Sequence, residues 1–527
     1  MTPLPNKPIA VRLSWRRAAF DVFSIVLVRA ARSKALSVVI AFLYLFGSVS
    51  YSNAQSANFW SAQKKIPDYF AAAQQPPYII ADQNHTIHAF NSQPLDLEAE
   101  FSPKALYYRQ WKEESGWAYP NDIILDENGG DVEVLDVTRD SSGIVYLIYQ
   151  KNYQSIYFTY ATLADAGKST AWATSIQIAP ESTHVSIGFE SLASMVVDDD
   201  GTIVVVYSGN QAGQGLYSVH SLDHGNNWSQ PYPVYLTGDG LVVTTDPELI
   251  LSKSGKAHVV WSTFMSDGFG GPGYYANIDL TTHTWSDPVP LDLPGIRTPS
   301  IVEHNDDLFI SYYHYSNNGN WWRRSSDGGD TWTLSSRLSP RHVGTNGRVS
   351  FVIDSANTLH AFFGERINDQ NHGMWESIWR GGAWSTPEPV VKGPQIRDVP
   401  GGFGFDPASA RAIISNGNLV LVSWATDGFA GVNGAWYAYK RLNAPELPTI
   451  VDVEPTLAVS VLSTDTSVPV TSIVITNTPS ISLDELDRQP AVTIYNPQTS
   501  ILAGVFMALA LVSGVVLLRI VSQSRKP

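Results

Sequence analysis

The sequence predicts an all-β fold, a seven-bladed β-propeller, with a six-bladed ring as the alternative. Three observations predict it: a Trp signal that recurs about every 50 residues, an apolar strand between successive signals, and a composition rich in strand and turn formers. The 527 residues include 16 Trp, 24 Tyr, 39 Gly and 32 Pro, and only 16% are charged. Such a composition favours many short strands joined by tight turns.

The tryptophan signals are spaced like the units of a repeat fold. Each is followed by small or polar residues, and they stand at Trp60, Trp117, Trp172, Trp228, Trp285, Trp332 and Trp384. The strands between them, such as residues 203–206, are apolar almost throughout, which indicates burial on both faces. They end in an aromatic residue at Phe90, Tyr149, Tyr207, Trp261, Tyr312, Phe363 and Trp424. Four strands in about 50 residues are typical of a propeller blade.

The two ends of the repeat predict how the ring closes. Trp60 precedes any complete unit, whereas the last unit, residues 407–441, has no Trp signal of its own. We therefore expect the segment around Trp60 to supply the outermost strand of the last blade, which leaves no open sheet edge.

Two turns carry a sharper pattern. Residues 325–332 read Ser-x-Asp-x-Gly-x-Thr-Trp, and residues 221–228 repeat the pattern with Asn227 in place of Thr. With the blade spacing, this resembles the sialidase-like propellers with BNR, or Asp-box, repeats over residues 58–442. We expect Asp327 and Asp223 to be structural, since Asp accepts hydrogen bonds within the turn, Gly permits positive φ and Trp packs on the adjoining blade.

Acids and arginines are expected to meet at one mouth of the central channel, where loops of a propeller bind ligands. The resemblance implies an arginine cluster that holds a sugar carboxylate, a Tyr nucleophile activated by a Glu, and an Asp acid/base. Residues 296–300 look like the Arg-Ile-Pro segment of that family. The predicted site residues are Arg297, Arg348, Arg397, Glu190 and Asp246, with Glu248 as a less favoured partner for the nucleophile.

A purely structural alternative stays open for the same residues. In it, Arg297 and Arg348 pair with Glu190, Asp246 or Asp406 and fill the channel as an ion-pair network. His88, His258 and His360 recur at one blade position and are expected to pack in the core. We expect neither a cofactor nor a metal.

The chain ends predict export and a membrane anchor. Residues 1–54 read as a signal peptide or signal anchor, residues 443–498 as a Pro/Thr/Ser-rich stalk, and residues 500–521 as a transmembrane helix with a short basic tail. The propeller would then lie outside the cell, on a single-pass anchor. The net charge of −15 argues against nucleic acid as a partner, and the absence of Cys excludes disulfides and thiolate chemistry.

The resemblance implies a cell-surface exo-glycosidase that acts on acidic glycans. A non-catalytic propeller that binds a carbohydrate or a surface protein is the alternative. An envelope assembly scaffold, which the anchor alone suggests, is a third.

Overall fold

The structure is a computed structural model that describes residues 59–448, except 70–74, 83, 97–101, 153, 180–191, 239–240, 266–269, 293, 316, 341–343, 368–371, 394–406 and 427–433. These residues belong to a compact unit, Met1–Asp452. The predicted signal segment, the transmembrane helix and all but the first residues of the stalk lie outside the described residues. Within the described residues, the longest helices are single 3-10 turns, so none could span a bilayer.

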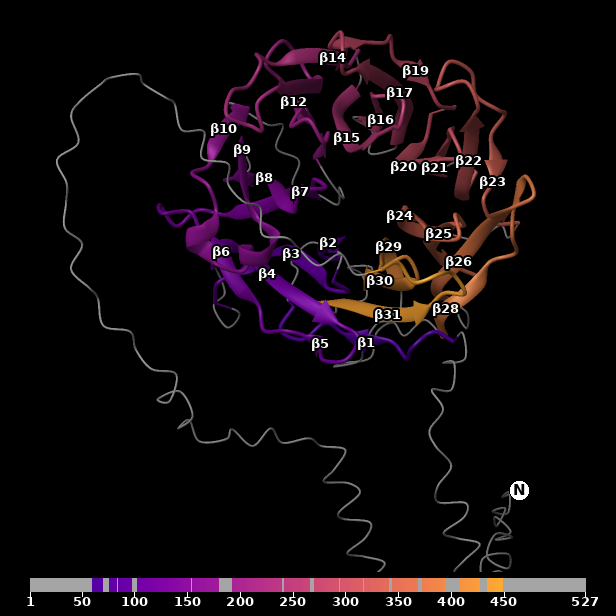
Figure 1. The fold of residues 1–527 in the computed structure, drawn as a ribbon. Helices are drawn as coiled ribbons and strands as arrows, with labels where there is room; N and C mark the ends of the chain where they lie inside the picture. Colours follow the sequence, from indigo (N-terminus) through magenta and orange to yellow (C-terminus); the bar gives the residue numbers. More distant parts are fainter. Residues whose placement is uncertain are drawn as a thin grey trace, which may run out of the picture. The chain divides into compact units, whose positions relative to one another are not determined.

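Seven antiparallel sheets surround a central axis, which confirms the seven-bladed propeller and excludes six blades (Figure 1). The first blade consists of β2 (Tyr78–Ala81), β3 (Ile87–Pro94), β4 (Lys104–Lys112), β5 (Gly116–Trp117) and β6 (Asn121–Ile124). The second consists of β7 (Val132–Arg139), β8 (Ile144–Lys151), β9 (Ser155–Thr162) and β10 (Ile176–Ala179). The third consists of β11 (Ala193–Val197), β12 (Ile203–Gly209), β13 (Gly215–Ser221) and β14 (Tyr232–Leu236). The short helices η1 (Leu163–Asp165) and η2 (Ser169–Ala171) lie between β9 and β10.

The next three blades follow the same order from the axis outward. The fourth blade consists of β15 (Leu241–Leu251), β16 (Lys256–Met265), β17 (Gly270–Asp279), β18 (Thr284–Trp285) and β19 (Val289–Pro290). The fifth consists of β20 (Ile296–His304), β21 (Asp307–His314), β22 (Gly319–Ser325) and β23 (Ser336–Arg337). The sixth consists of β24 (Gly344–Ile353), β25 (Leu359–Arg366), β26 (His372–Arg380), β27 (Ala383–Trp384) and β28 (Glu388–Gly393). The first strand of each blade is its innermost strand.

The seventh blade joins the two ends of the repeat, as predicted. It contains β29 (Pro407–Ser415), β30 (Leu419–Thr426), β31 (Ala435–Arg441) and, as its outermost strand, β1 (Lys64–Lys65). Lys64 pairs with Tyr437, and the Ser61 N–H donates to the Tyr439 carbonyl at 2.9 Å. Trp60 packs edge-on against Phe362 of the sixth blade, with 5.7 Å between ring centroids. The segment around Trp60 therefore closes the ring.

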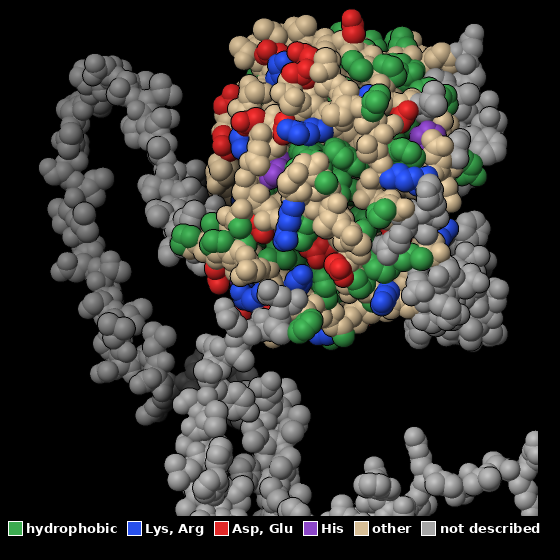
Figure 2. Space-filling view, turned by 90° about the vertical axis from the view of Figure 1, so that its right-hand side faces the viewer, with side chains coloured by type: hydrophobic (Ala, Val, Ile, Leu, Met, Phe, Trp, Pro, Cys, Tyr) green, Lys and Arg blue, Asp and Glu red, His purple; other side chains and the backbone are tan. Residues whose placement is uncertain are grey.

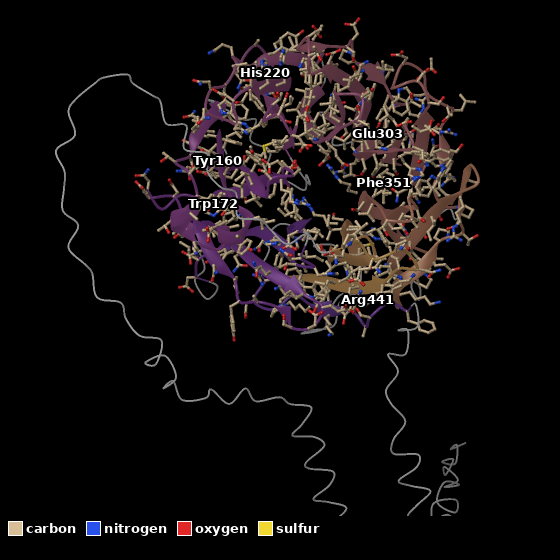
Figure 3. All side chains as sticks on the ribbon, in the orientation of Figure 1. Tyr160, Trp172, His220, Glu303, Phe351 and Arg441 are labelled. Carbon is tan, nitrogen blue, oxygen red and sulfur yellow. The ribbon has the colours of Figure 1, made fainter. Side chains whose placement is uncertain are left out.

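The core lies between neighbouring blades, where the second strand of each blade is buried on both faces. On β12, residues 203–207 are all buried, and Val205 and Tyr207 pack with Tyr146 and Ile148 of β8 in the preceding blade. Side chains fill the spaces between the blades (Figure 3). Burial of this apolar surface, worth about 25 cal/mol per Å², holds the blades side by side.

The Ser-x-Asp-x-Gly-x-Thr-Trp turn has the structural role expected of it. Asp327 accepts a hydrogen bond from the Thr331 N–H at 2.9 Å, and the Thr331 hydroxyl, followed by that N–H, lowers the pKa of Asp327 to about 2. Gly329 has a φ of 99°. Trp332 packs edge-on against Tyr275 of the preceding blade, with 5.0 Å between centroids. Trp228 packs in the same way on Phe158, so both turns fasten one blade to the one before it.

The recurring histidines lie in the core, as expected. His88 and His258 each contact a Tyr hydroxyl through Nδ1 at 2.7 Å, and Nδ1 of His360 lies 2.8 Å from Glu376. All three rings are at most 3% exposed. No group of three or more potential metal ligands is found among the described residues.

The propeller extends slightly beyond its predicted end. The Leu447 N–H donates to the Asn416 carbonyl at 2.8 Å, so the first residues of the predicted stalk run along the seventh blade. On the face of the ring seen in Figure 2, the described Lys and Arg side chains are interspersed with Asp and Glu and form no continuous basic patch in that view.

Candidate functional site

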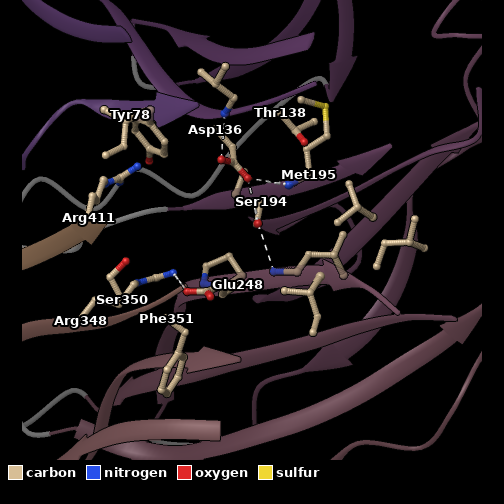
Figure 4. Close-up of a pocket in the computed structure, with 18 of the residues that line it drawn as sticks. Tyr78, Asp136, Thr138, Ser194, Met195, Glu248, Arg348, Ser350, Phe351 and Arg411 are labelled. Carbon is tan, nitrogen blue, oxygen red and sulfur yellow. Dashed lines mark hydrogen bonds and ion pairs between the residues drawn. The ribbon is translucent and has the colours of Figure 1, made fainter. Parts of the chain in front are cut away.

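A cavity of about 450 Å³ occupies the centre of the ring. The innermost strands of six blades line it: β2, β7, β11, β15, β24 and β29 (Figure 4). Its chemically distinctive lining residues are Tyr78, Asp136, Ser194, Glu248, Arg348 and Arg411. The volume lies in the range of small-molecule sites, about 300–1,000 Å³.

One polar residue on each of six innermost strands stands at the same sheet position. We call this set the channel belt. The second strand of each blade has an aromatic residue toward its end, and each belt member pairs across its sheet with the residue just before that aromatic residue. Glu248, for example, pairs with Val260, which precedes Trp261. The members are Asp136, Ser194, Glu248, Ser300, Ser350 and Arg411.

Most of the channel belt joins each blade to the next. A side-chain oxygen of one member hydrogen-bonds to the backbone beside the following member at 2.6–3.3 Å. The linked pairs are Asp136 with Met195, Ser194 with Leu249, Glu248 with Ile301, Ser300 with Val349, and Ser350 with Ala412. Polar groups near the channel are thus largely committed to holding the ring together.

Local backbone geometry aims these side chains at the axis. Strand pairing shifts register just before the belt position in β7, β15, β20, β24 and β29, as at a β-bulge. In three of these bulges a non-glycine residue has a positive φ: 52° at Asp246, 45° at Thr298 and 52° at Ser409. A bulge adds a residue to one strand and redirects the side chains that follow it. Glu248 therefore faces the cavity, whereas Asp246 does not line it.

Asp136 is held by three donors. Its carboxylate accepts hydrogen bonds from the Ser194 hydroxyl at 2.9 Å, the Met195 N–H at 2.9 Å and the Val137 N–H at 2.8 Å (Figure 4). Burial nevertheless raises its pKa, because the loss of water outweighs these hydrogen bonds. A carboxyl group in this state is easier to protonate than an exposed one.

Glu248 and Arg348 form an ion pair across the cavity wall, from the fourth blade to the sixth (Figure 4). Arg348 also donates to the Asp246 carbonyl at 3.2 Å, and Glu248 accepts the Ile301 N–H at 3.3 Å. Burial raises the pKa of Glu248 even though the nearby Arg348 guanidinium opposes the rise. Arg348 therefore forms an ion pair at the channel, as in the predicted alternative, but with Glu248 instead of Glu190, Asp246 or Asp406.

Arg411 differs from Arg348 in its surroundings. Its guanidinium carbon lies 3.3 Å from the centroid of the Tyr78 ring, on β2 of the first blade. No carboxylate within the described part of the chain forms an ion pair with it, although the charge of Asp136 is close enough to interact with it. Among the described residues, its guanidinium is therefore not paired with a carboxylate.

The other predicted site residues are not gathered at this cavity. Arg297 lies over the Phe264 ring, 5.6 Å from its centroid, and does not line the cavity. Asp246 is buried, and its carboxylate accepts the Thr245 hydroxyl at 3.1 Å. Glu190 and Arg397 lie outside the described residues, so their predicted roles remain untested.

Asp136, Arg411 and Tyr78 were missed by the sequence analysis, although the sequence contains a signal for the first two. Each member of the channel belt precedes the aromatic end of the following strand by 12 or 13 residues. A polar residue at that spacing, beside an apolar strand, marks the axis of the ring. Tyr78 shows no such signal, because Ile79 occupies the corresponding sheet position on β2.

The comparisons with known proteins give distant structural likenesses alone. No family model and no curated protein matches the sequence. An ulvan lyase, a polysaccharide lyase solved bound to -[GlcA(1-4)Rha3S]-, superposes with a TM-score of 0.46 at 13% identity, over 72% of this chain and 96% of its own. A protein of unknown function from Dyadobacter fermentans gives 0.42 at 13% identity, over 72% and 99%. The NanB sialidase from Streptococcus pneumoniae gives 0.40 at 12% identity, over 73% and 70%.

Proposed function

We propose that this protein is a cell-surface, glycan-active propeller whose central cavity takes up an acidic saccharide residue. The observation that carries the proposal is a cavity of about 450 Å³ that contains an arginine, Arg411, with no acidic partner among the described residues. Its second arginine, Arg348, is neutralised by Glu248. Among the described residues, the cavity therefore offers one guanidinium without an ion-pair partner to one anionic group.

The chemistry of the lining supports a sugar more than a flat apolar ligand. Hydroxyl, carboxyl and guanidinium groups surround the cavity from several blades, and a guanidinium matches a carboxylate or sulfate through paired N–H donors. An apolar ligand would leave the Arg411 guanidinium without water or a hydrogen-bonding partner, which costs roughly 1–3 kcal/mol or more for a charged group.

Binding by the full-length protein tests the proposal. Affinity for saccharides that end in a sialic or uronic acid is measured by titration calorimetry, next to the same saccharides with the carboxyl group reduced to an alcohol. We expect clear preference for the acidic forms, and a weaker preference at high salt because the contact is electrostatic. Equal affinity for both forms would contradict an anion-selective cavity.

Hydrolysis of the bound saccharide is a second candidate, favoured by the raised pKa values of Asp136 and Glu248 in the same cavity. A carboxyl group with a raised pKa keeps its proton to a higher pH than an exposed one, and in the protonated form it can act as a general acid toward a leaving-group oxygen. Aryl sialosides and aryl glucuronides serve as substrates, with Asp136→Asn and Glu248→Gln as variants and Arg297→Ala to test the arginine predicted from the sequence. If the wild type releases no aryl alcohol, the hydrolase candidate is discarded and the binding function remains.

The location is part of the proposal. The predicted anchor at residues 500–521 and the predicted export segment at residues 1–54 would hold the propeller outside the cell. Protease added to intact cells should then degrade the propeller. A propeller that resists protease in intact cells, but not after lysis, would argue against this location.

A further inference from the structure

The channel belt is interrupted where the last blade meets the first. Five of its members reach the backbone of the next blade, but Arg411 makes no such hydrogen bond within the described part of the chain. On β2 the corresponding residue is Ile79, which has no polar group to continue the belt. The first blade is linked to the second from another strand, through the Ser92 hydroxyl and the Val134 N–H at 2.8 Å. The junction of β29 and β2 is thus held by ring stacking instead of a hydrogen bond.

Tyr78 has an unsatisfied polar group at this junction. The residue lines the cavity, is 7% exposed, and its hydroxyl has no hydrogen-bond partner among the described residues. Several buried polar atoms of the described residues share this status, and the Tyr78 hydroxyl is distinguished by its place beside an arginine at the cavity wall. The Arg411 guanidinium lies against the ring of this same Tyr (Figure 4).

We propose that Arg411 and Tyr78 together form an oxyanion-binding site at the junction of the seventh and first blades. A guanidinium that lies over a ring still carries N–H donors at its edge, which can pair with two oxygens of one anion. The Tyr78 O–H supplies a further donor beside them. This assignment rests on the proposed function and names the residues that would hold the acidic group of the saccharide.

The surrounding charges favour a singly charged group, a carboxylate or a sulfate ester. Asp136 on β7 faces Arg411 and partly offsets its charge. The other nearby arginine, Arg109, is 1% exposed and donates to the backbone carbonyls of Pro67 and Asp68. Tyr69, the remaining titratable neighbour of both arginines, is buried, and burial raises its pKa, so it stays neutral. A cation that is offset only in part suits a ligand group with a single negative charge.

A bound oxyanion would also complete the belt. It would connect β29 to β2 through Arg411 and Tyr78, where no belt hydrogen bond is found among the described residues. Ligand binding should therefore stabilise the closure of the ring as well as occupy the cavity, since a ligand that binds the closed form alone shifts the equilibrium toward it.

The experiment uses the full-length wild type with Arg411→Gln, Tyr78→Phe and Arg348→Gln variants. Arg337→Gln is the matched control, because Arg337 also lies over a ring, that of Trp321 at 4.8 Å, but on the outer strand β23. The probes are glucuronate, N-acetylneuraminate and methyl sulfate, a sulfate ester, with glucose as the neutral probe, at constant ionic strength. Titration calorimetry should show at least tenfold weaker anion binding for Arg411→Gln, a several-fold loss for Tyr78→Phe, and wild-type binding for Arg337→Gln.

Anion binding that survives in both Arg411→Gln and Tyr78→Phe would overturn the assignment. If it is lost in Arg348→Gln alone, an acidic saccharide still binds the cavity, so the proposed function stands while this site is wrong. If methyl sulfate binds through Arg411 and Tyr78 but neither acidic sugar does, the site stands and the saccharide function fails.

Hydrogen exchange on the wild type covers the case in which a variant does not fold. With glucuronate present, amides of β2 and β29 should exchange several-fold more slowly than with glucose, and those of β11 should change less. Equal protection of β2, β29 and β11 would contradict an anion bound at the junction.

Discussion

Replacing His258 by Gln should remove part of the acid sensitivity of the fold. His258 is 1% exposed, and burial, with a smaller contribution from the charge of Lys256, lowers its pKa from 6.5 to about 4. Its Nδ1 lies 2.7 Å from the Tyr275 hydroxyl, which donates at 3.2 Å to the Gly328 carbonyl in the next blade. The neutral ring is therefore part of a link between blades.

The sign of the effect follows from the lowered pKa. Above pH 6.5 the ring is neutral in both the folded and the unfolded chain, and it contributes no pH dependence. As the pH falls toward 4, the unfolded chain takes up a proton that the folded chain resists, so stability is lost. Each tenfold change in proton affinity is worth about 1.4 kcal/mol, so the wild type should lose about 3 kcal/mol through this residue by pH 4.

Urea unfolding followed by Trp fluorescence between pH 7.5 and pH 4 measures the effect. The pH dependence that comes from titratable groups common to both proteins cancels when the free energy of unfolding of His258→Gln is subtracted from that of the wild type. The Gln side chain itself does not titrate. The variant should be less stable than the wild type near pH 7, where it packs less well, and this deficit should shrink or reverse near pH 4. Parallel stability curves for the two proteins would refute the reasoning.

Three further predictions concern the ring. Trp332→Ala should lower the free energy of unfolding by about 2–4 kcal/mol, since it removes the packing on Tyr275. Trp332→Phe should lower the free energy of unfolding by less, and equal losses for the two variants in urea unfolding would contradict this. Burial raises the pKa of Asp136 above 3.8, so the stability of the wild type should fall as the pH rises through that raised pKa. In a series of melting temperatures against pH, Asp136→Asn should not show this loss of stability. Deletion of residues 59–66 should abolish cooperative melting in calorimetry, and an unchanged transition would show that β1 does not close the ring.

The architecture could be predicted because its signals are local and repeated. A Trp that packs on the preceding blade and a strand buried on both faces recur in each unit, and each copy reinforces the same interpretation. Trp60 outside any complete unit was sufficient to predict the closure, because a blade without an outer strand would leave an unpaired edge. The role of Asp327 was equally local, since its hydrogen bonds lie within its own turn.

The cavity was harder to predict because it depends on which side chains face the axis. A bulge at Asp246 buries that residue and turns Glu248 inward, so the ion pair with Arg348 involves an acid that was predicted only as a less favoured partner for the nucleophile. Arg297 was selected for its likeness to a family segment, but its side chain lies over Phe264. The spacing of the channel belt could have identified Asp136 and Arg411. Their different roles depend on contacts between blades, which no single repeat contains.

The closure of the ring also has a consequence for how the chain folds. Ser61 and Tyr439 are 378 positions apart, yet they exchange hydrogen bonds in the finished blade. During synthesis the first strand emerges long before its partner, so the nascent chain carries an unpaired edge until nearly the whole propeller has been made. Contacts between such distant segments form slowly. Chains truncated before β31 should therefore be prone to associate with one another through β1 and the edge of β30, both of which β31 normally covers.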